Sequence, residues 1–134
     1  MSSELRLQAL LLADHIYRDE GSGKYVIAGT FHQVNVATFP TTLVRTVGIF
    51  VSLSGLTGKA ALDVELVEVA SGESLMRTRS MEVSCDHPDQ PVELALEVPP
   101  LPLPRPGRYV FRLLVNGAPL GEATVLARGP GAKG

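Results

Sequence analysis

The chain has 134 residues, of which 45% are hydrophobic and 19% are charged, and its formal net charge at pH 7 is −2. A chain of this length and composition can bury a substantial core, which excludes a disordered protein and suits one domain. The slightly negative charge also argues against nucleic acid as a partner, because binding to phosphates requires a basic surface.

Cysteine content and the start of the chain bear on location. Cys85 is the only cysteine, which excludes an intrachain disulfide and fits a reducing compartment. The start lacks the basic and apolar regions of a signal peptide, and the apolar run from Ala9 to Ala13 is far shorter than the ~20 residues of a membrane helix. We therefore expect a cytoplasmic protein with no membrane partner. Residues 1–128 should form a single domain, followed by a flexible glycine-rich tail over residues 129–134.

The first predicted strand runs from Leu5 into Tyr17. A helix is the competing interpretation, but the β-prone end of the segment and the polar, glycine-containing turn at residues 19–24 favour a strand. Alternation leaves Leu10 and Leu12 on the outer face, where they would form an exposed apolar stripe. The predicted inward set is Leu5, Leu7, Ala9, Leu11 and Ala13.

The next two predicted strands differ in how their faces are covered. Both faces of the segment from Tyr25 to Val36 are partly apolar, which predicts one strand that is covered on both sides along part of its length. Pro40 then marks a break or a sheet edge, because proline lacks the backbone donor of a ladder. A third strand extends from Leu43 to Ser54, and its predicted inward set is Val47, Ile49, Val51 and Leu53.

Strands in the middle of the chain alternate more strictly. Apolar Leu62, Val64 and Leu66 are predicted to face inward, and the intervening residues at 63, 65 and 67 are predicted to face water. A hairpin turn at residues 70–73 leads to a returning strand. The predicted strands after the first three are Leu62 to Val67, Leu75 to Cys85, Val92 to Val98, Tyr109 to Val115 and Leu120 to Ala127.

The last third of the chain contains three turn or connector signals. Pro99 to Pro106 holds five prolines, which predicts an extended connector outside any sheet, with a polyproline ligand as the alternative. Asn116-Gly117 is a strong hairpin dipeptide. Leu120 and Ala123 both look inward although they are three residues apart, so we predict a bulge near Gly121-Glu122.

These eight segments predict the fold class. Each has an apolar face, and strands joined by short turns are antiparallel, so two sheets must cover one another. We therefore predict an all-β, antiparallel two-sheet β-sandwich of about eight strands, with a barrel as the alternative that sequence does not separate from it.

Two segments resemble known families. Pro106-Gly107-Arg108-Tyr109, ahead of the Asn-Gly hairpin, resembles the penultimate strand of immunoglobulin-like and fibronectin-like sandwiches. The resemblance implies that Tyr109 is a tyrosine corner, whose hydroxyl bonds to upstream backbone. The cysteine pair and tryptophan of antibody domains are absent, so the resemblance implies a distant, disulfide-free relative.

The second resemblance covers more of the chain. Leu12-Ala13-Asp14-His15-Ile16-Tyr17, then Gly23 through Phe31, then Phe39-Pro40 are similar to a family of small bacterial β-sandwich proteins of unknown function. This similarity implies a bacterial origin and the same fold, and it implies no chemistry.

Few residues suggest a reactive or metal-binding site. His15, His32, Cys85 and His87 are the candidate ligands, but no pair has the spacing of a metal motif, and Cys85-Asp86-His87 offers only two ligands. A C2-like calcium site on the loops would draw on Asp14, Asp19, Glu20, Asp86 and Asp89. The simpler interpretations are a buried strand-end cysteine, hydrogen-bonded histidines and solvated turns. We expect Asp14 to fix the turn at residues 19–24 by accepting backbone donors.

We predict a non-catalytic module, since no catalytic arrangement emerges from the residue types and their spacing. Its partner would be an unknown protein or a second copy of itself, and no cofactor is predicted. The alternative is a ligand- or metal-binding sandwich that uses the calcium or His/Cys candidates.

Overall fold

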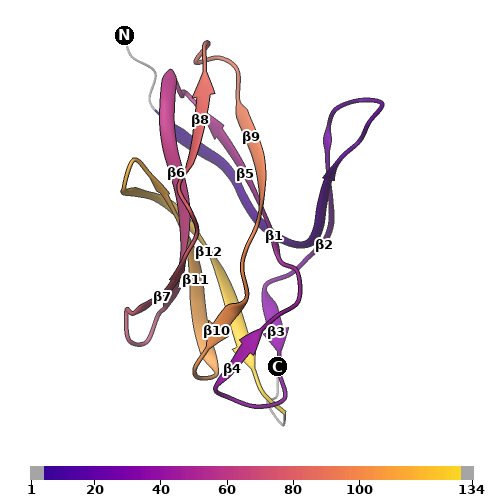
Figure 1. The fold of residues 1–134 in the computed structure, drawn as a ribbon, viewed down its shortest axis with the longest axis vertical. Helices are drawn as coiled ribbons and strands as arrows, with labels where there is room; N and C mark the ends of the chain where they lie inside the picture. The colour runs from indigo at the N-terminus through magenta and orange to yellow at the C-terminus, as the bar shows by residue number, and fades with distance from the viewer. Residues whose placement is uncertain (1–4, 131–134) are drawn as a thin grey trace.

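The computed structural model describes residues 5–130, which form twelve strands and no helix (Figure 1). No long apolar helix that could cross a membrane occurs in this part of the chain. In chain order the strands are β1 (Arg6–Arg18), β2 (Tyr25–Thr30), β3 (Gln33–Asn35), β4 (Thr41–Leu43), β5 (Gly48–Ser54), β6 (Gly58–Glu68), β7 (Ser74–Arg77), β8 (Met81–Cys85), β9 (Val92–Glu97), β10 (Leu101–Leu103), β11 (Gly107–Val115) and β12 (Ala118–Arg128).

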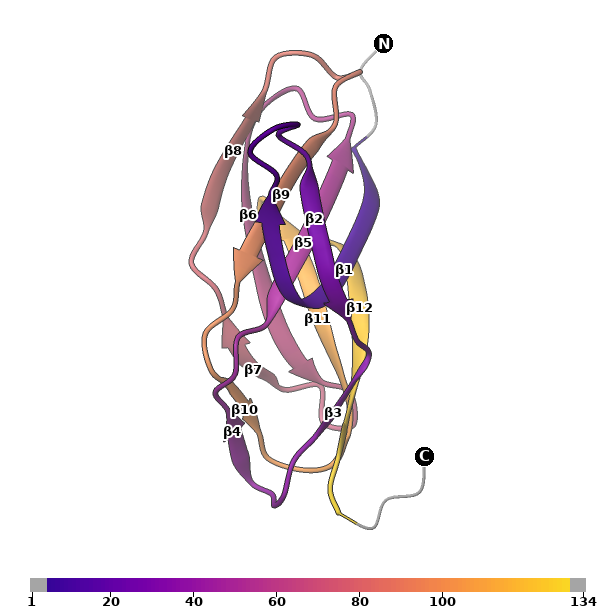
Figure 2. The same ribbon diagram turned by 90° about the vertical axis from the view of Figure 1, so that its right-hand side faces the viewer.

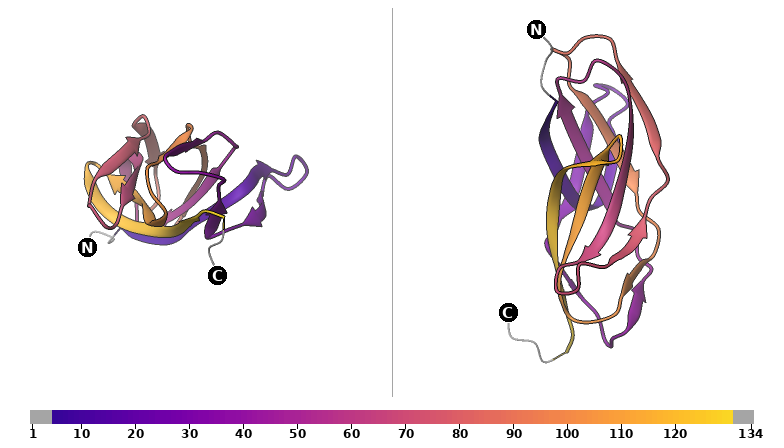
Figure 3. Two further views of the ribbon diagram at one scale, coloured as in Figure 1. Left: turned by 90° about the horizontal axis from the view of Figure 1, so that it is seen from below. Right: turned by 90° about the vertical axis from the view of Figure 1, so that its left-hand side faces the viewer.

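Two sheets form the predicted all-β sandwich. The smaller sheet has the order β2-β1-β5-β9, and Figure 2 looks onto it. The larger sheet has the order β3-β12-β11-β6-β7, with β8 also paired to β6, and it faces the viewer on the right of Figure 3. A separate two-stranded ribbon joins β10 and β4. Of the predicted tail at residues 129–134, the part after Pro130 lies outside the described residues.

The core lies between the two sheets and confirms most of the predicted inward sets. Val47 and the alternating β5 residues Ile49, Val51 and Leu53 are fully buried. The inward residues of β6 and β11 in the larger sheet belong to the same core as these β5 residues. They are Leu62, Val64, Leu66, Tyr109, Phe111 and Leu113. Side chains of two inner faces that interdigitate in this way hold the sandwich together.

Beyond Leu7 the predicted alternation of β1 is wrong, although Ala13 is buried as predicted. Leu7 pairs with Leu53, but the next pair is Ala9 with Ser52, so Gln8 is an extra, bulged residue. An extra residue reverses the alternation that follows it. Leu12 is therefore 4% exposed and in the core, whereas Leu11 is 40% exposed on the outer face. The expected outer stripe of Leu10 and Leu12 does not form.

The predicted strand from Tyr25 to Val36 is two strands in different sheets. β2 pairs with β1, whereas β3 pairs with β12, and that pairing is parallel rather than antiparallel. The four residues from Tyr25 to Ala28 are partly buried on both faces of β2, whereas Gly29 and Thr30 at its end are exposed. The segment combines residues of two sheets, which explains why both of its faces contain apolar residues.

Other predicted segments are divided in the same way. The third predicted strand becomes β4 and β5, and β4 follows the break at Pro40. The strand predicted from Leu75 to Cys85 becomes β7 and β8. The proline-rich connector was wrongly placed outside any sheet, since its residues 101–103 pair with β4. A two-stranded ribbon has free edges, where a missing proline donor costs little.

The β11–β12 hairpin contains the predicted turn and a bulge. Asn116 and Gly117 both have positive φ, 51° and 82° respectively, as a tight two-residue turn requires. Leu113 pairs with Gly121 and Leu114 pairs with Pro119, so Leu120 is the extra residue. The bulge thus lies one residue before the predicted position. The Asn116 side chain also accepts a hydrogen bond of 2.9 Å from the Ala61 backbone of β6.

Candidate functional site

The predicted metal ligands are not brought together. His15 lies on β1 opposite Ala28, and His32 lies between β2 and β3. Cys85 ends β8 at the edge of the other sheet, and His87 follows it in a loop. Among residues 5–130 no group of three or more histidine, cysteine, aspartate or glutamate side chains could hold a metal ion, and this includes the acidic residues considered for calcium.

Cys85 holds a loop in place. Its buried thiol donates to the carbonyl of His87 at 3.0 Å, and the carbonyl of Gln90 lies 3.4 Å from the sulfur. A weak donor shared between two backbone acceptors suits a structural cysteine. The imidazole of His87 takes no part in these contacts, so the Cys85-Asp86-His87 segment has the geometry of a strand end followed by a tight turn.

Asp14 has a structural role that differs from the predicted one. Asp19, not Asp14, holds the turn at residues 19–24, since its carboxylate accepts bonds of 2.8 Å from both the backbone and the hydroxyl of Ser22. These hydrogen bonds lower the pKa of Asp19. Asp14 instead pairs with Arg45 at 3.5 Å. The pair lies at the base of the β1–β2 hairpin.

The base of this hairpin gathers residues of the second resemblance. Arg45 lies over the Phe31 ring, 4.6 Å from its centre, while its guanidinium pairs with Asp14. Gly29 has a φ of +76°, and a Cβ atom there would lie 2.6 Å from the Asp14 carboxylate. Only glycine therefore fits opposite Asp14. The family-like segments thus have a shared structural role in shaping the start of the hairpin.

Beyond Ala13, β1 leaves β5 and pairs only with β2, so the hairpin projects as an arm (Figure 1). The edge of the Tyr25 ring packs against Phe50, with ring centres 5.4 Å apart. A small cavity of about 330 Å³ lies between the arm and β5 and β9. Its lining includes two of the predicted candidates, Asp14 and His15. Cys85 and Asp86 line a separate, open pocket of about 310 Å³.

The outer face of the larger sheet is not simply wet, contrary to prediction. Asp63 is buried there and pairs with Arg77. Glu68, which lies opposite Tyr109 on the inner face at the end of β6, is also buried and pairs with Arg105. Glu68 also accepts a bond of 2.6 Å from the Ser71 hydroxyl. The hydrogen bonds from Arg105 and Ser71 lower the pKa of Glu68. Buried carboxylates require such partners, and both have them.

Tyr109 makes the contact that the immunoglobulin-like resemblance implies. Its hydroxyl donates to the carbonyl of Arg105, four residues upstream, and the Arg105 backbone amide donates back at 3.2 Å. Burial of the ring raises the pKa of Tyr109. Because the Arg105 side chain also binds Glu68, this corner connects the start of β11 to the end of β6.

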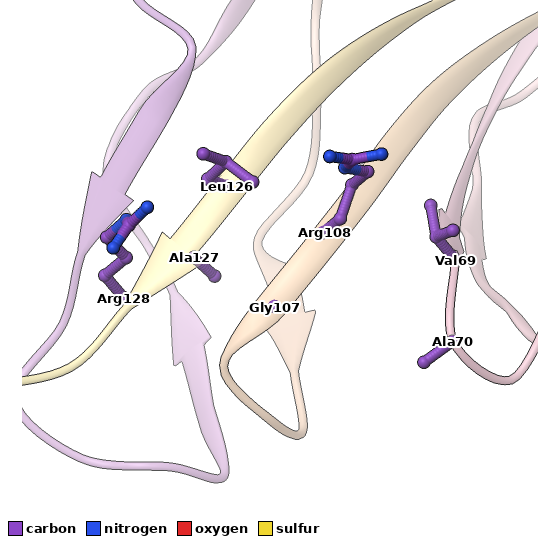
Figure 4. A pocket seen from close by; sticks show the side chains of 7 residues that line it. All are labelled: Val69, Ala70, Gly107, Arg108, Leu126, Ala127 and Arg128. Carbon is purple, nitrogen blue, oxygen red and sulfur yellow. The ribbon is translucent and has the colours of Figure 1, made fainter. Parts of the chain in front are cut away.

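An open groove of about 500 Å³ lies on the outer face of the larger sheet, near the start of β11 and the end of β12 (Figure 4). Seven residues line it: Val69, Ala70, Gly107, Arg108, Leu126, Ala127 and Arg128. They include two arginines and no acidic residue. In Figure 4 the Leu126 side chain lies between the Arg108 and Arg128 side chains. We take this groove as the candidate functional site.

The register of the sheet explains the charge of the groove. Arg112 lies opposite Glu65 on one side and Glu122 on the other, and it contacts both, at 3.3 and 3.7 Å. Arg108 lies four residues earlier on the same face of β11. Its cross-strand neighbours are Leu126 and Val69, which are both apolar. None of the ion pairs found within residues 5–130 includes Arg108.

Sequence reasoning missed this groove. Alternation correctly placed Tyr109 inward and therefore Arg108 outward. The sequence pattern gave no indication of which residues surround Arg108 on the outer face. Whether an outward arginine meets carboxylates or apolar residues depends on the partner strands and their register. The neighbours of Arg108 are Val69, just after β6, and Leu126 on β12, and both lie outside the local sequence pattern around Arg108.

Comparison with known proteins places the chain in a family. A model of a family of unknown function, DUF6941, matches residues 8–127. The chain belongs to DUF6941. No curated protein matches it in sequence.

Solved structures share the fold of this DUF6941 protein. The alkylpurine DNA glycosylase AlkC of Pseudomonas fluorescens, bound to DNA with an abasic site analogue, matches 95% of the chain at 16% identity and a TM-score of 0.58. A β-glucosidase of Listeria innocua matches 94% at 12% identity and a TM-score of 0.54. The matched region spans only 31% of the glycosylase chain and 16% of the glucosidase chain.

An immunoglobulin-like protein of Pseudomonas aeruginosa matches 95% of the chain and 98% of its own, at 17% identity and a TM-score of 0.42. The DUF6941 protein is a small all-β sandwich in a family of unknown function. At these identities the solved structures show the fold, and the function has to be argued from the surface of the chain itself.

Proposed function

We propose that this protein is a non-catalytic protein-binding module and that the groove on the larger sheet is its binding surface. The observation that carries the proposal is Arg108, an exposed cation set between two apolar neighbours on an open sheet face. Arginine combined with apolar contact area is typical of residues that dominate protein interfaces.

The location of the groove supports this function. The backbone of β11 is hydrogen-bonded on both sides there, to β12 and to Val69, so the surface is a firm platform and not a loose loop. Val69 is 46% exposed at its rim. A rigid surface loses little conformational entropy when a partner binds.

The alternative of a metal-binding sandwich receives no support from residues 5–130, because its candidate ligands are dispersed. Nucleic acid is also disfavoured as a partner by the net charge of −2. We propose that the module works in the cytoplasm, as the single buried Cys85 and its free thiol suggest.

Photo-cross-linking in the native cell tests this function. A photoreactive benzoylphenylalanine replaces Val69 at the groove or, as a control, Val44, which is 78% exposed outside it. We expect discrete protein adducts from the Val69 position that are absent from the Val44 position. Identical adduct patterns from the two positions, or none from either, would refute the groove as a protein-binding surface.

A further inference from the structure

The arginines near the larger sheet differ in their neighbours. Arg77, Arg105 and Arg112 each contact a carboxylate of the chain itself. Two of these contacts, of Arg77 with Asp63 and of Arg112 with Glu65, neutralise carboxylates on the outer face of the larger sheet. Arg108 lies on the same face among apolar neighbours, and Arg128 lies on the far side of Leu126 (Figure 4). Arg108 therefore places a positive charge in the groove of a chain that is negative overall.

The groove also offers apolar contacts beside this charge. Val69 and the half-buried Leu126 flank Arg108 on adjacent strands, which lie about 4.8 Å apart in a sheet. Gly107 lies at one end of the groove, and no atom lies within 4 Å of where its Cβ would be. A short extended segment, whose side chains on one side repeat every ~6.8 Å, can reach both the cation and an apolar contact.

We infer that the groove binds an acidic, partly apolar segment of a partner protein, with an aspartate or glutamate side chain on Arg108 and an apolar side chain on Leu126 or Val69. The inference rests on the proposed function and specifies the chemistry of the partner. Charge complementarity carries it: among residues 5–130 no carboxylate pairs with Arg108, so the ligand supplies one. A bond between a guanidinium and a carboxylate is among the stronger polar contacts.

A random peptide library tests the inference. The peptides are displayed with both ends joined to the carrier, so that only side-chain carboxylates are available. They are selected on the full chain and on three variants: Val69→Asp, Arg108→Gln, and Arg79→Gln as a matched control. Arg79 is an exposed arginine outside the groove. Selected peptides are then measured as purified probes, each beside its Glu→Gln and Asp→Asn counterpart.

We expect selected peptides to be rich in acidic and apolar residues. Replacing Arg108 by Gln, or the peptide carboxylate by its amide, should weaken binding about tenfold. Arg79→Gln should leave the affinity unchanged. The Arg108 and peptide changes should not be additive, because they remove the same contact.

Two other results would overturn the inference, and they are distinguishable. Peptides that bind in a manner sensitive to Val69→Asp but show no preference for acidic residues would refute the carboxylate site and leave the proposed function standing. An absence of any peptide sensitive to Val69→Asp would count against both. If sedimentation shows a dimer that Arg108→Gln dissociates, the occupant is a second copy of this chain and the foreign segment is refuted.

Discussion

The role of a charged residue on this protein is set by its cross-strand neighbours more than by its own position in the sequence. Arg108 and Arg112 lie on one face of one strand, yet Arg112 meets two carboxylates and Arg108 meets two apolar side chains. Glu68 lies opposite Tyr109 on the inner face of β6, and its buried carboxylate is held by Arg105 and Ser71. Pairing across strands therefore decides whether a charge stabilises the fold or stays available to a partner.

Glu68 gives a prediction about acid stability. Its folded pKa lies below the ordinary value of 4.5, so its stabilising contribution is fully present above that pH and is lost as the pH falls through the folded pKa. Glu68→Gln should therefore destabilise the protein most near neutral pH, and the gap to the wild type should narrow on acidification. Urea unfolding between pH 7 and pH 3, at roughly one-unit intervals, measures this gap.

The exposed Glu93 of β9 serves as the control for that series. Glu93→Gln should give a small difference that stays nearly constant with pH. A Glu68→Gln gap that widens as the pH falls would contradict the assigned direction of the pKa shift.

Whole strands depend on single bulged residues. Without the bulge at Gln8, simple alternation would bury Leu11 and expose Leu12, and the structure does the opposite. The bulge at Leu120 acts in the same way on β12, where it reconciles Leu120 with Ala123. The second bulge was predictable because two apolar residues conflicted; the first was hidden because leucine fills both faces of β1.

Two alanine substitutions test the bulge at Gln8. Leu12→Ala should lower the free energy of unfolding by about 3 kcal/mol, because it leaves a cavity in the core. Leu11→Ala should cost less than about 1 kcal/mol, because much of that side chain is already in water. Chemical denaturation of both variants provides the comparison. The reverse order of the two effects would mean that the register of β1 lacks the bulge.

At the scale of the whole molecule, the sandwich is closed by segments that cross between sheets. Residues 25–36 pass from the smaller sheet to the larger one, and residues 41–43 and 101–103 form a ribbon beside both (Figure 2). The arm formed by β1 and β2 stands apart from this closure, since it is only two strands wide beyond Ala13. Two-stranded ribbons are marginally stable in isolation.

Hydrogen exchange tests this division. Backbone amides of the arm, at residues 16–18 and 25–27, should exchange faster than those of β5 at residues 49–53, which have strands on both sides. Exchange measured by NMR under native conditions resolves the two groups. Equal protection would show that the arm opens only when the whole sandwich unfolds.

The sequence by itself determined the class of fold and most of the core. Strict alternation at Ile49, Val51 and Leu53, and again in β11, identified the buried faces, because an extended chain turns successive side chains to opposite sides. Asn116-Gly117 identified the last hairpin, because a tight turn needs two residues with positive φ. Two apolar faces then required two layers.

The tertiary structure alone decided which strands are neighbours, and through them the groove. Backbone hydrogen bonds are the same for every residue except proline, so a strand carries little information about its partner. The split of residues 25–36 between sheets, the pairing of 101–103 with β4, and the apolar neighbours of Arg108 all follow from packing of the complete chain. Local pattern assigns a side chain to a face, whereas its neighbours on that face depend on how distant segments fill the same core.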